Sequence, residues 1–228
     1  MKKTAGLFLL FAFGLVAADF WQKPYTEWGD KDAAKMMTDS PWAKSAGVSM
    51  GGPAPPAMPA GGGPGGGLQG GGGSEFGPGA QGSTPPSFDI VARWQSALPI
   101  RQAFVRLKFG AEADKSAEAG KVLQQLERPY EIVLSGPMGT FLAGKPEDVA
   151  KALSEVTSLS SRRTGGIKPS QIEVGKPGKT MDVLFAFPRS MPFTLEDKEV
   201  ELTTKLSTST LKYKFKLKDM VLNGKLEM

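Results

Sequence analysis

Carboxylate, lysine, serine and tyrosine side chains are the groups with which this chain would have to do any chemistry. The chain contains no cysteine and no histidine. This excludes thiolate nucleophiles, the commonest general base and the commonest transition-metal ligands. The densest acidic group is Glu196, Asp197 and Glu199. Carboxylate pairs hydrolyse glycosides, and carboxylate clusters bind calcium, but this group lacks the spacing of a calcium loop. We therefore interpret it as an acidic turn before a strand.

Two other patterns approach a catalytic motif without completing it. The run from Gly139 to Pro146 is similar to a phosphate-binding loop, but Pro146 stands where that motif needs a hydroxyl for magnesium. Ser135 and Ser161 lack the Gly-x-Ser-x-Gly setting of an esterase nucleophile. The sequence predicts no catalytic residue, no cofactor and no metal site, so we expect a protein that is not an enzyme.

A row of lysines near the C-terminus is the most regular charged pattern. The row consists of Lys212, Lys214, Lys216 and Lys218, which alternate with Leu211, Tyr213, Phe215 and Leu217. This alternation is typical of a strand with one buried face and one wet face. The lysines then form either an anionic-ligand surface or a solvated face that discourages edge aggregation. The sequence favours the solvated face.

Aromatic residues are concentrated in residues 19–45. A short helix is predicted over 30–38, with Ala33, Ala34 and Met37 on one face. The residues with which this segment would bind a partner are Trp21, Tyr25, Trp28, Met37 and Trp42. Because so short a helix is marginal alone, the segment must pack on something. Two interpretations remain open, namely docking on another molecule and packing on its own domain.

Export is predicted by the first 18 residues. Lys2 and Lys3 precede a continuous apolar run, and small residues end it at Ala18. This is the pattern of a cleavable secretory signal peptide, and the apolar run is too short for a membrane-spanning helix. We therefore expect a bacterial protein that is periplasmic or secreted, with no transmembrane segment after cleavage.

Residues 46–87 have the composition of a disordered linker. They contain 16 glycines and 8 prolines among 42 residues. Such a segment has little to bury against the entropy lost on ordering. We interpret it as a spacer or tether between the aromatic segment and the following domain.

The remaining residues, 88–228, are expected to form one domain. Helices are predicted to begin near Leu98, Asp114 and Pro146, and Ile100, Ala103, Phe104 and Leu107 of the first should face the core. Strands are predicted at 88–94 and 130–134 and from Gln171 onward, with 181–187 the most apolar of them. The expected fold is α+β, with about three helices and a mainly antiparallel sheet that ends in a C-terminal β-meander.

The last 30 residues also predict a strand register. A turn at Thr208–Ser209 pairs Leu206 with Leu211 and Leu202 with Phe215, and places Glu201 opposite Lys216. Asn223–Gly224 is the signature of a type I′ hairpin turn.

The run from Trp28 to Ala43 resembles the mature N-terminus of a group of uncharacterised exported bacterial proteins. It is also similar to part of the GWxTD domain, whose Thr-Asp pair corresponds to Thr38 and Asp39. The stretch from Phe215 to Glu227 resembles the same group. The resemblance implies an exported protein and no known activity.

These observations lead to one expectation and two alternatives. We expect an exported, non-enzymatic interaction or scaffolding protein of the cell envelope, whose partner is a protein or an envelope component. The alternatives are a carbohydrate-active enzyme that uses carboxylates and a binder of anionic envelope polymers. The formal net charge of +5 is too small and too dispersed for a nucleic-acid-binding surface, so no nucleic-acid partner is expected.

Overall fold

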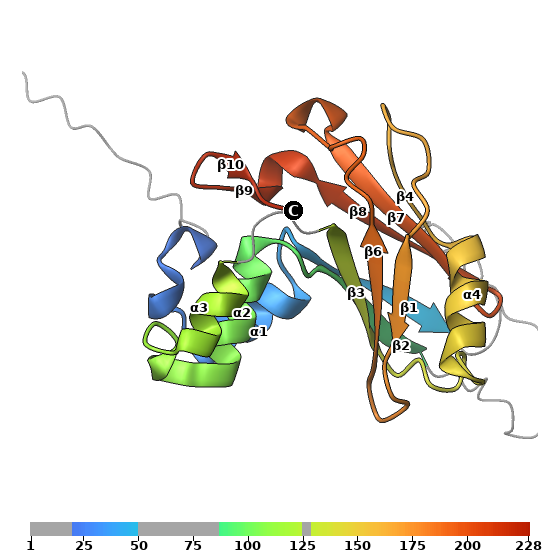
Figure 1. The fold of residues 1–228 in the computed structure, drawn as a ribbon, viewed down its shortest axis with the longest axis horizontal. Coiled ribbons are helices and arrows are strands. Elements are labelled where there is room, and N and C mark those ends of the chain that lie inside the picture. Colours follow the sequence, from blue (N-terminus) through green and yellow to red (C-terminus); the bar gives the residue numbers. More distant parts are fainter. Residues whose placement is uncertain (1–19, 50–86, 125–128) are drawn as a thin grey trace, which may run out of the picture.

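A computed structural model of the protein describes residues 20–49, 87–124 and 129–228. Four α-helices lie within this part of the chain (Figure 1). Their bounds are α1 (Asp30–Thr38), α2 (Leu98–Phe109), α3 (Ala117–Leu123) and α4 (Pro146–Val156). The predicted signal peptide, residues 1–18, and most of the predicted linker, residues 46–87, lie outside the described residues.

Three antiparallel sheets contain the strands of the described chain. The largest has the order β1-β2-β3-β6-β5, the second β4-β7-β8, and the third pairs β9 with β10. The strands are β1 (Ala43–Ser49), β2 (Ser87–Trp94), β3 (Tyr130–Gly136), β4 (Ser158–Ser161), β5 (Gln171–Val174), β6 (Met181–Phe187), β7 (Glu199–Leu206), β8 (Ser209–Lys216), β9 (Val221–Leu222) and β10 (Lys225–Leu226). The predicted α+β class is confirmed, including the antiparallel strands at the C-terminus.

The main core lies between the large sheet and the three-stranded sheet. Figure 1 shows β7 and β8 crossing behind β3 and β6, with α1, α2 and α3 at one end and α4 at the other. The rings of Trp94 and Phe215 pack edge to face across this core, with their centroids 5.3 Å apart. The Tyr213 hydroxyl donates a hydrogen bond of 3.0 Å to the Ile90 carbonyl. Burial raises the pKa of Tyr213 and keeps this donor protonated.

The aromatic N-terminal segment is part of this one fold, which corrects the predicted division at residues 45 and 88. Strand β1 pairs with β2 from Ala43↔Arg93 to Ser49↔Ser87, so residues on both sides of the predicted linker belong to one hairpin. The β1 sequence consists mainly of small residues and has no alternating apolar pattern. Its partner lies far along the chain, so no local signal indicated the strand.

Helix α1 has the predicted bounds, but it buries a different face. Gly29 is its N-cap, and the Asp32 carboxylate accepts a hydrogen bond of 3.4 Å from the Gly29 N–H. The buried residues are Ala33 and Met36, whereas Ala34 is exposed.

Helix α2 ends at Gly110 as predicted, but Phe104 and Leu107 are 38% and 45% exposed. The first turns of α2 lie on the core, and the later turns extend past it.

The C-terminal hairpin is displaced by two residues from the predicted register. Its turn lies at Ser207–Thr208, Leu206 pairs with Ser209, and Leu202 pairs with Tyr213. Glu201 therefore faces Lys214 rather than Lys216. A displacement of two keeps every side chain on its predicted face, because side chains alternate with a period of two. The Asn223–Gly224 turn is confirmed, since both residues have positive φ values of 50° and 76°.

Candidate functional site

Two of the aromatic residues predicted to bind a partner are buried in the protein's own core. Trp28 and Trp42 are 1% and 0% exposed. The Trp42 Nε1–H donates a hydrogen bond of 2.8 Å to the Glu227 carbonyl, and the Trp28 Nε1–H donates one of 3.2 Å to the Lys23 carbonyl. Their prediction as docking residues is therefore wrong. The apolar area of each indole is buried by the fold itself, which stabilises the domain instead.

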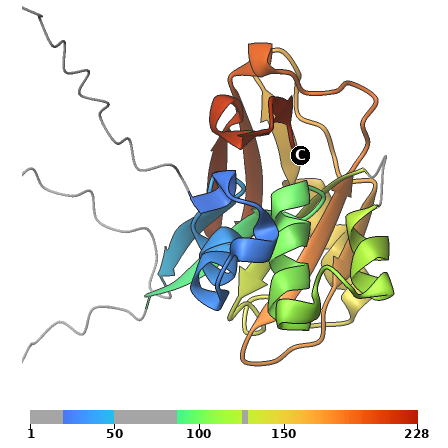
Figure 2. The ribbon, with the colours of Figure 1, turned by 90° about the vertical axis from the view of Figure 1, so that its left-hand side faces the viewer.

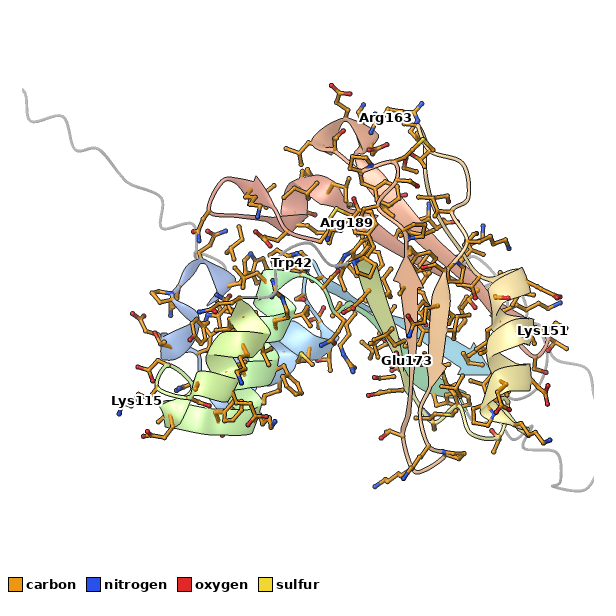
Figure 3. The ribbon with its side chains drawn as sticks, in the orientation of Figure 1. Trp42, Lys115, Lys151, Arg163, Glu173 and Arg189 are labelled. Atoms are coloured by element: carbon orange, nitrogen blue, oxygen red, sulfur yellow. The ribbon has the colours of Figure 1, made fainter. Side chains whose placement is uncertain are left out.

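Trp21, Tyr25 and Met37 remain partly exposed. The Trp21 ring meets Phe20 edge to face at 5.1 Å and Trp42 at 6.2 Å. The 3₁₀ helix η1 (Phe20–Gln22), which carries Trp21, is thus fixed by aromatic contacts. The buried Trp42 ring thus packs against the partly exposed Trp21 ring and helps to position it. Figure 3 shows Trp42 between the helices and the strands.

The lysines of the C-terminal row lie in two electrostatic environments. Lys212 lies 3.5 Å from Glu201, and Lys214 lies 3.4 Å from Glu199. These two pairs are on the wet face of the β7–β8 hairpin, which agrees with the solvated-face interpretation. Lys218 has a different position. It belongs to the 3₁₀ helix η5 (Leu217–Met220), whose Leu217 and Met220 side chains are buried and whose Lys218 and Asp219 are exposed.

A cleft of about 690 Å³ brings Trp21 and Lys218 together. Figure 2 shows the blue N-terminal segment beside the red C-terminal segment, and the cleft lies between these two parts of the chain. We name it the basic aromatic cleft and define it by its lining aromatic and lysine residues, Phe20, Trp21, Lys35, Lys44 and Lys218. Asp39 and Asp219 also line it. Lys35 lies with its Nζ atom 5.7 Å from the centre of the Phe20 ring.

The elements around the cleft explain how its lysines are presented. Lys35 lies in the last turn of helix α1, and Asp39 is the C-cap residue that follows the helix. Strand β1 buries Ala43 and turns Lys44 the other way. Among the described residues, no carboxylate oxygen lies within 4.0 Å of the ammonium group of Lys35, Lys44 or Lys218. The cleft therefore gathers three lysines that form no ion pair within 4.0 Å among the described residues, although Asp39 and Asp219 also line it.

Sequence reasoning found only part of this site. Trp21 and Lys218 were candidates, but in two unrelated groups of residues. Lys35 and Lys44 were not, because neither belongs to a charge pattern and both lie far from Lys218 in sequence. Lys216 is exposed on β8, and the structure does not place it in the cleft.

One member of the acidic group Glu196, Asp197 and Glu199 is held in an ion pair. Asp197 is buried, and its carboxylate accepts bonds from the Arg163 guanidinium at 2.8 and 3.1 Å. The Ser161 hydroxyl and the Thr194 N–H also donate to it. Arg163, labelled in Figure 3, lies over the turn that contains Asp197. Its hydrogen bonds hold the pKa of Asp197 at about 2, although burial of the carboxylate opposes this. Asp197 is thus a structural anion.

A second hollow, of about 610 Å³, lies on the outer face of the large sheet. Three carboxylates line it, from Glu131, Glu173 and Asp182. Asp182 is held by Arg93, at 3.3 Å, and by the Ser135 hydroxyl. Glu131 on β3 and Glu173 on β5 have β6 between them, so their strands lie about 10 Å apart. Figure 3 places Glu173 on this face. Of these three carboxylates, Asp182 is in an ion pair, and Glu173 accepts a hydrogen bond of 2.8 Å from the Gln171 side-chain amide.

No protein-family model matches the chain, and neither a curated protein sequence nor a solved structure was found to be similar to it. The resemblance of residues 28–43 and 215–227 to exported bacterial proteins stays a prediction. Within the described ranges, no helix is long and apolar enough to cross a membrane. The same ranges contain no group of three or more acidic side chains placed to hold a metal ion.

Proposed function

We propose that this chain is an exported, non-enzymatic interaction protein of the cell envelope that binds an anionic envelope component through the basic aromatic cleft. One observation carries the proposal. Lysines from three elements, Lys35, Lys44 and Lys218, line a single cleft that Phe20 and Trp21 wall on one side. Export is supported by the signal-like residues 1–18.

The lysines of the cleft differ from those of the neighbouring strand in the charge that surrounds them. Lys212 and Lys214 have glutamates on β7 as partners. The cleft lysines have no such partner among the described residues, although Asp39 and Asp219 line the same cleft. An incoming anion can therefore form ion pairs with these lysines. Each exposed pair of this kind contributes about 0.2–1 kcal/mol. Several together give measurable and salt-sensitive binding.

Export predicts a defined mature protein. Cleavage after Ala18 removes the apolar run and leaves Asp19 as the first residue. N-terminal sequencing of the protein isolated from the envelope fraction of its cells should therefore begin at Asp19-Phe20-Trp21. A chain that retains Met1 in the cytoplasmic fraction would contradict the proposal.

Binding is tested with a matched pair of double variants. Polygalacturonate and polyphosphate serve as immobilised anionic probes at 50 and 300 mM salt. We expect Lys44→Gln with Lys218→Gln to weaken binding about fivefold to tenfold, since two charge contacts are lost. Binding by the unmodified chain should also weaken at the higher salt.

Lys212→Gln with Lys214→Gln is the control, because it changes the net charge by the same amount. These two ammonium groups already have glutamate partners, so we expect binding to stay within twofold of the unmodified chain. An equal loss in both double variants would mean that only net charge matters, and the cleft would not be the binding site.

A further inference from the structure

A smaller hollow continues the basic aromatic cleft on the other side of Trp21. Its volume is about 270 Å³, and Trp21 and Gln22 line both hollows. Tyr25, Gln102 and Asn223 line only the smaller one. The η1 helix thus forms a ridge between two adjacent depressions. A ligand with at least two linked units fits this arrangement better than a single small anion.

The chemistry of the lining side chains restricts the ligand further. Asp39 and Asp219 lie in the cleft beside its three lysines, so its formal charge is only +1. These carboxylates weaken the attraction of the cleft for a polyanion with a dense negative charge. Carboxylates and amides accept hydrogen bonds from hydroxyl groups, and ammonium groups and amides donate to them. The cleft combines hydrogen-bond donors and acceptors with a net charge of +1. This combination fits a polyhydroxylated ligand with moderate negative charge.

The aromatic residues supply the third requirement. Trp21 and Tyr25 are partly exposed, and each lines a hollow. An indole edge or face packs against the C–H groups of a sugar ring, which removes apolar area from water. Trp21 is held in place by Phe20 and Trp42, so little side-chain freedom is lost when a ligand packs on it.

We propose that the two hollows bind an acidic oligosaccharide with about one negative charge per sugar. One sugar occupies each hollow on either side of Trp21. The acidic group of the sugar in the larger cleft meets Lys44 and Lys218, and that of the sugar in the smaller hollow meets Lys23. This assignment rests on the proposed function and names the class of anion that the cleft takes. It adds that the sugar ring, and not the charge alone, is recognised.

Calorimetric titration of the full exported chain with three probes of matched length tests the assignment. The probes are tetragalacturonate, a neutral galactan tetrasaccharide and tetrapolyphosphate. We expect tetragalacturonate to bind at least tenfold more tightly than either of the others. A fourth probe, a phosphorylated tetrasaccharide, distinguishes a carboxylate from a phosphate as the preferred acid. Binding of either acidic sugar supports the proposal.

Variants at the ridge test the role of the ring contacts. Trp21→Ala should weaken tetragalacturonate binding about tenfold, and Gln22→Ala about threefold. Gln22 is exposed, so Gln22→Ala keeps the test valid if Trp21→Ala disturbs the fold. Phe104→Ala is the control, because Phe104 is a partly exposed aromatic residue that does not line either hollow. The indole N–H resonance of Trp21, assigned from Trp21→Phe, should shift when the sugar is added.

The possible failures separate the two proposals. Tetrapolyphosphate that binds as tightly as the acidic sugar, with no effect of Gln22→Ala, overturns the saccharide assignment and leaves anion binding intact. A neutral tetrasaccharide that binds as well as tetragalacturonate overturns the role of the lysines and with it the proposed function. If no anionic probe binds, both proposals are wrong.

Discussion

At the residue scale, Asp197 shows how this chain uses its most buried charge. Its carboxylate has no solvent exposure, and it receives donors from Arg163, Ser161 and Thr194. A buried anion is tolerated only when its oxygen atoms are paired and hydrogen-bonded. Asp197 thereby fixes the β4 loop to the turn before β7. The sequence presented the same residue as one member of an acidic cluster, and that cluster indicated nothing about burial.

This pairing predicts a pH dependence of stability. The folded pKa of Asp197 is about 2, below the ordinary aspartate value of about 3.9. The stabilisation is therefore complete above the unfolded pKa and is lost as pH falls from about 5 to about 2. It amounts to about 2 kcal/mol. We expect Asp197→Asn to lower the free energy of unfolding by about that amount at pH 7 and to flatten this acid limb.

Urea unfolding followed by tryptophan fluorescence at pH 7, 4 and 2.5 measures both effects. Glu196→Gln is the control, since Glu196 is an exposed neighbour that accepts no hydrogen bond from Arg163 in the described structure. An Asp197→Asn variant with an unchanged acid limb would contradict the assignment of Asp197 as a structural anion.

At the element scale, the turns fix what the strand patterns leave open. Alternation in β7 and β8 determines which side chains face inward, but registers that differ by two residues satisfy it equally. The turn at Ser207, where φ is 53°, selects one of them. The turn at Asn223–Gly224 was predictable because that dipeptide favours positive φ at both positions. A sequence thus predicts a register only where its turn has a strong conformational preference.

Gly224 provides a stability test of this argument. Its φ of 76° is a conformation that a Cβ atom disfavours, although no neighbouring atom lies within 4 Å of the added Cβ. We expect Gly224→Ala to lower the free energy of unfolding by about 1 kcal/mol because of backbone strain alone. Gly165→Ala is the matched control.

Gly165 also has open space around its Cβ position, but its φ is not in the left-handed region. We expect its variant to stay within about 0.5 kcal/mol of the unmodified chain. Chemical denaturation of both variants, with binding of tetragalacturonate as a second readout, makes the comparison. Equal losses in the free energy of unfolding at Gly224 and Gly165 would indicate that the positive φ of Gly224 is not the cause of the destabilisation.

At the scale of the whole molecule, the glycine- and proline-rich segment joins two neighbours in one sheet. Ser49 and Ser87 are paired residues of β1 and β2. The segment between them was predicted as a linker between two units. The structure shows one unit, since α1 packs on α2 and Trp42 is bonded to Glu227. The N-terminal segment, the domain and the C-terminus therefore contribute to one cooperative core.

This arrangement predicts that the domain folds without residues 50–86. Replacing these 37 residues by Asn-Gly leaves the paired ends in place and supplies a two-residue hairpin turn. Shortening the connection from 37 residues to two amounts to about four halvings of its length. Each halving lowers the entropic cost of loop closure by about 0.6 kcal/mol, so the domain should be stabilised by about 2 kcal/mol. Urea denaturation measures the shift in midpoint. A replacement of the same length but of Gly-Ser repeats should leave the midpoint unchanged, and a destabilised Asn-Gly variant would contradict the prediction.

The sequence by itself determined the features that depend on near neighbours along the chain. These include the bounds of α1, the start of α4, the Asn223–Gly224 turn, the wet and buried faces of β8 and the α+β class. Periodicity, caps and turn residues act over a few positions, so a local pattern is sufficient for them. Only the tertiary structure decided that Trp28 and Trp42 are core residues, that β1 pairs with β2, and that Lys35, Lys44 and Lys218 share a cleft with Trp21. These contacts join residues up to nearly 200 positions apart, and no local pattern distinguishes an indole that packs inward from one that binds a partner.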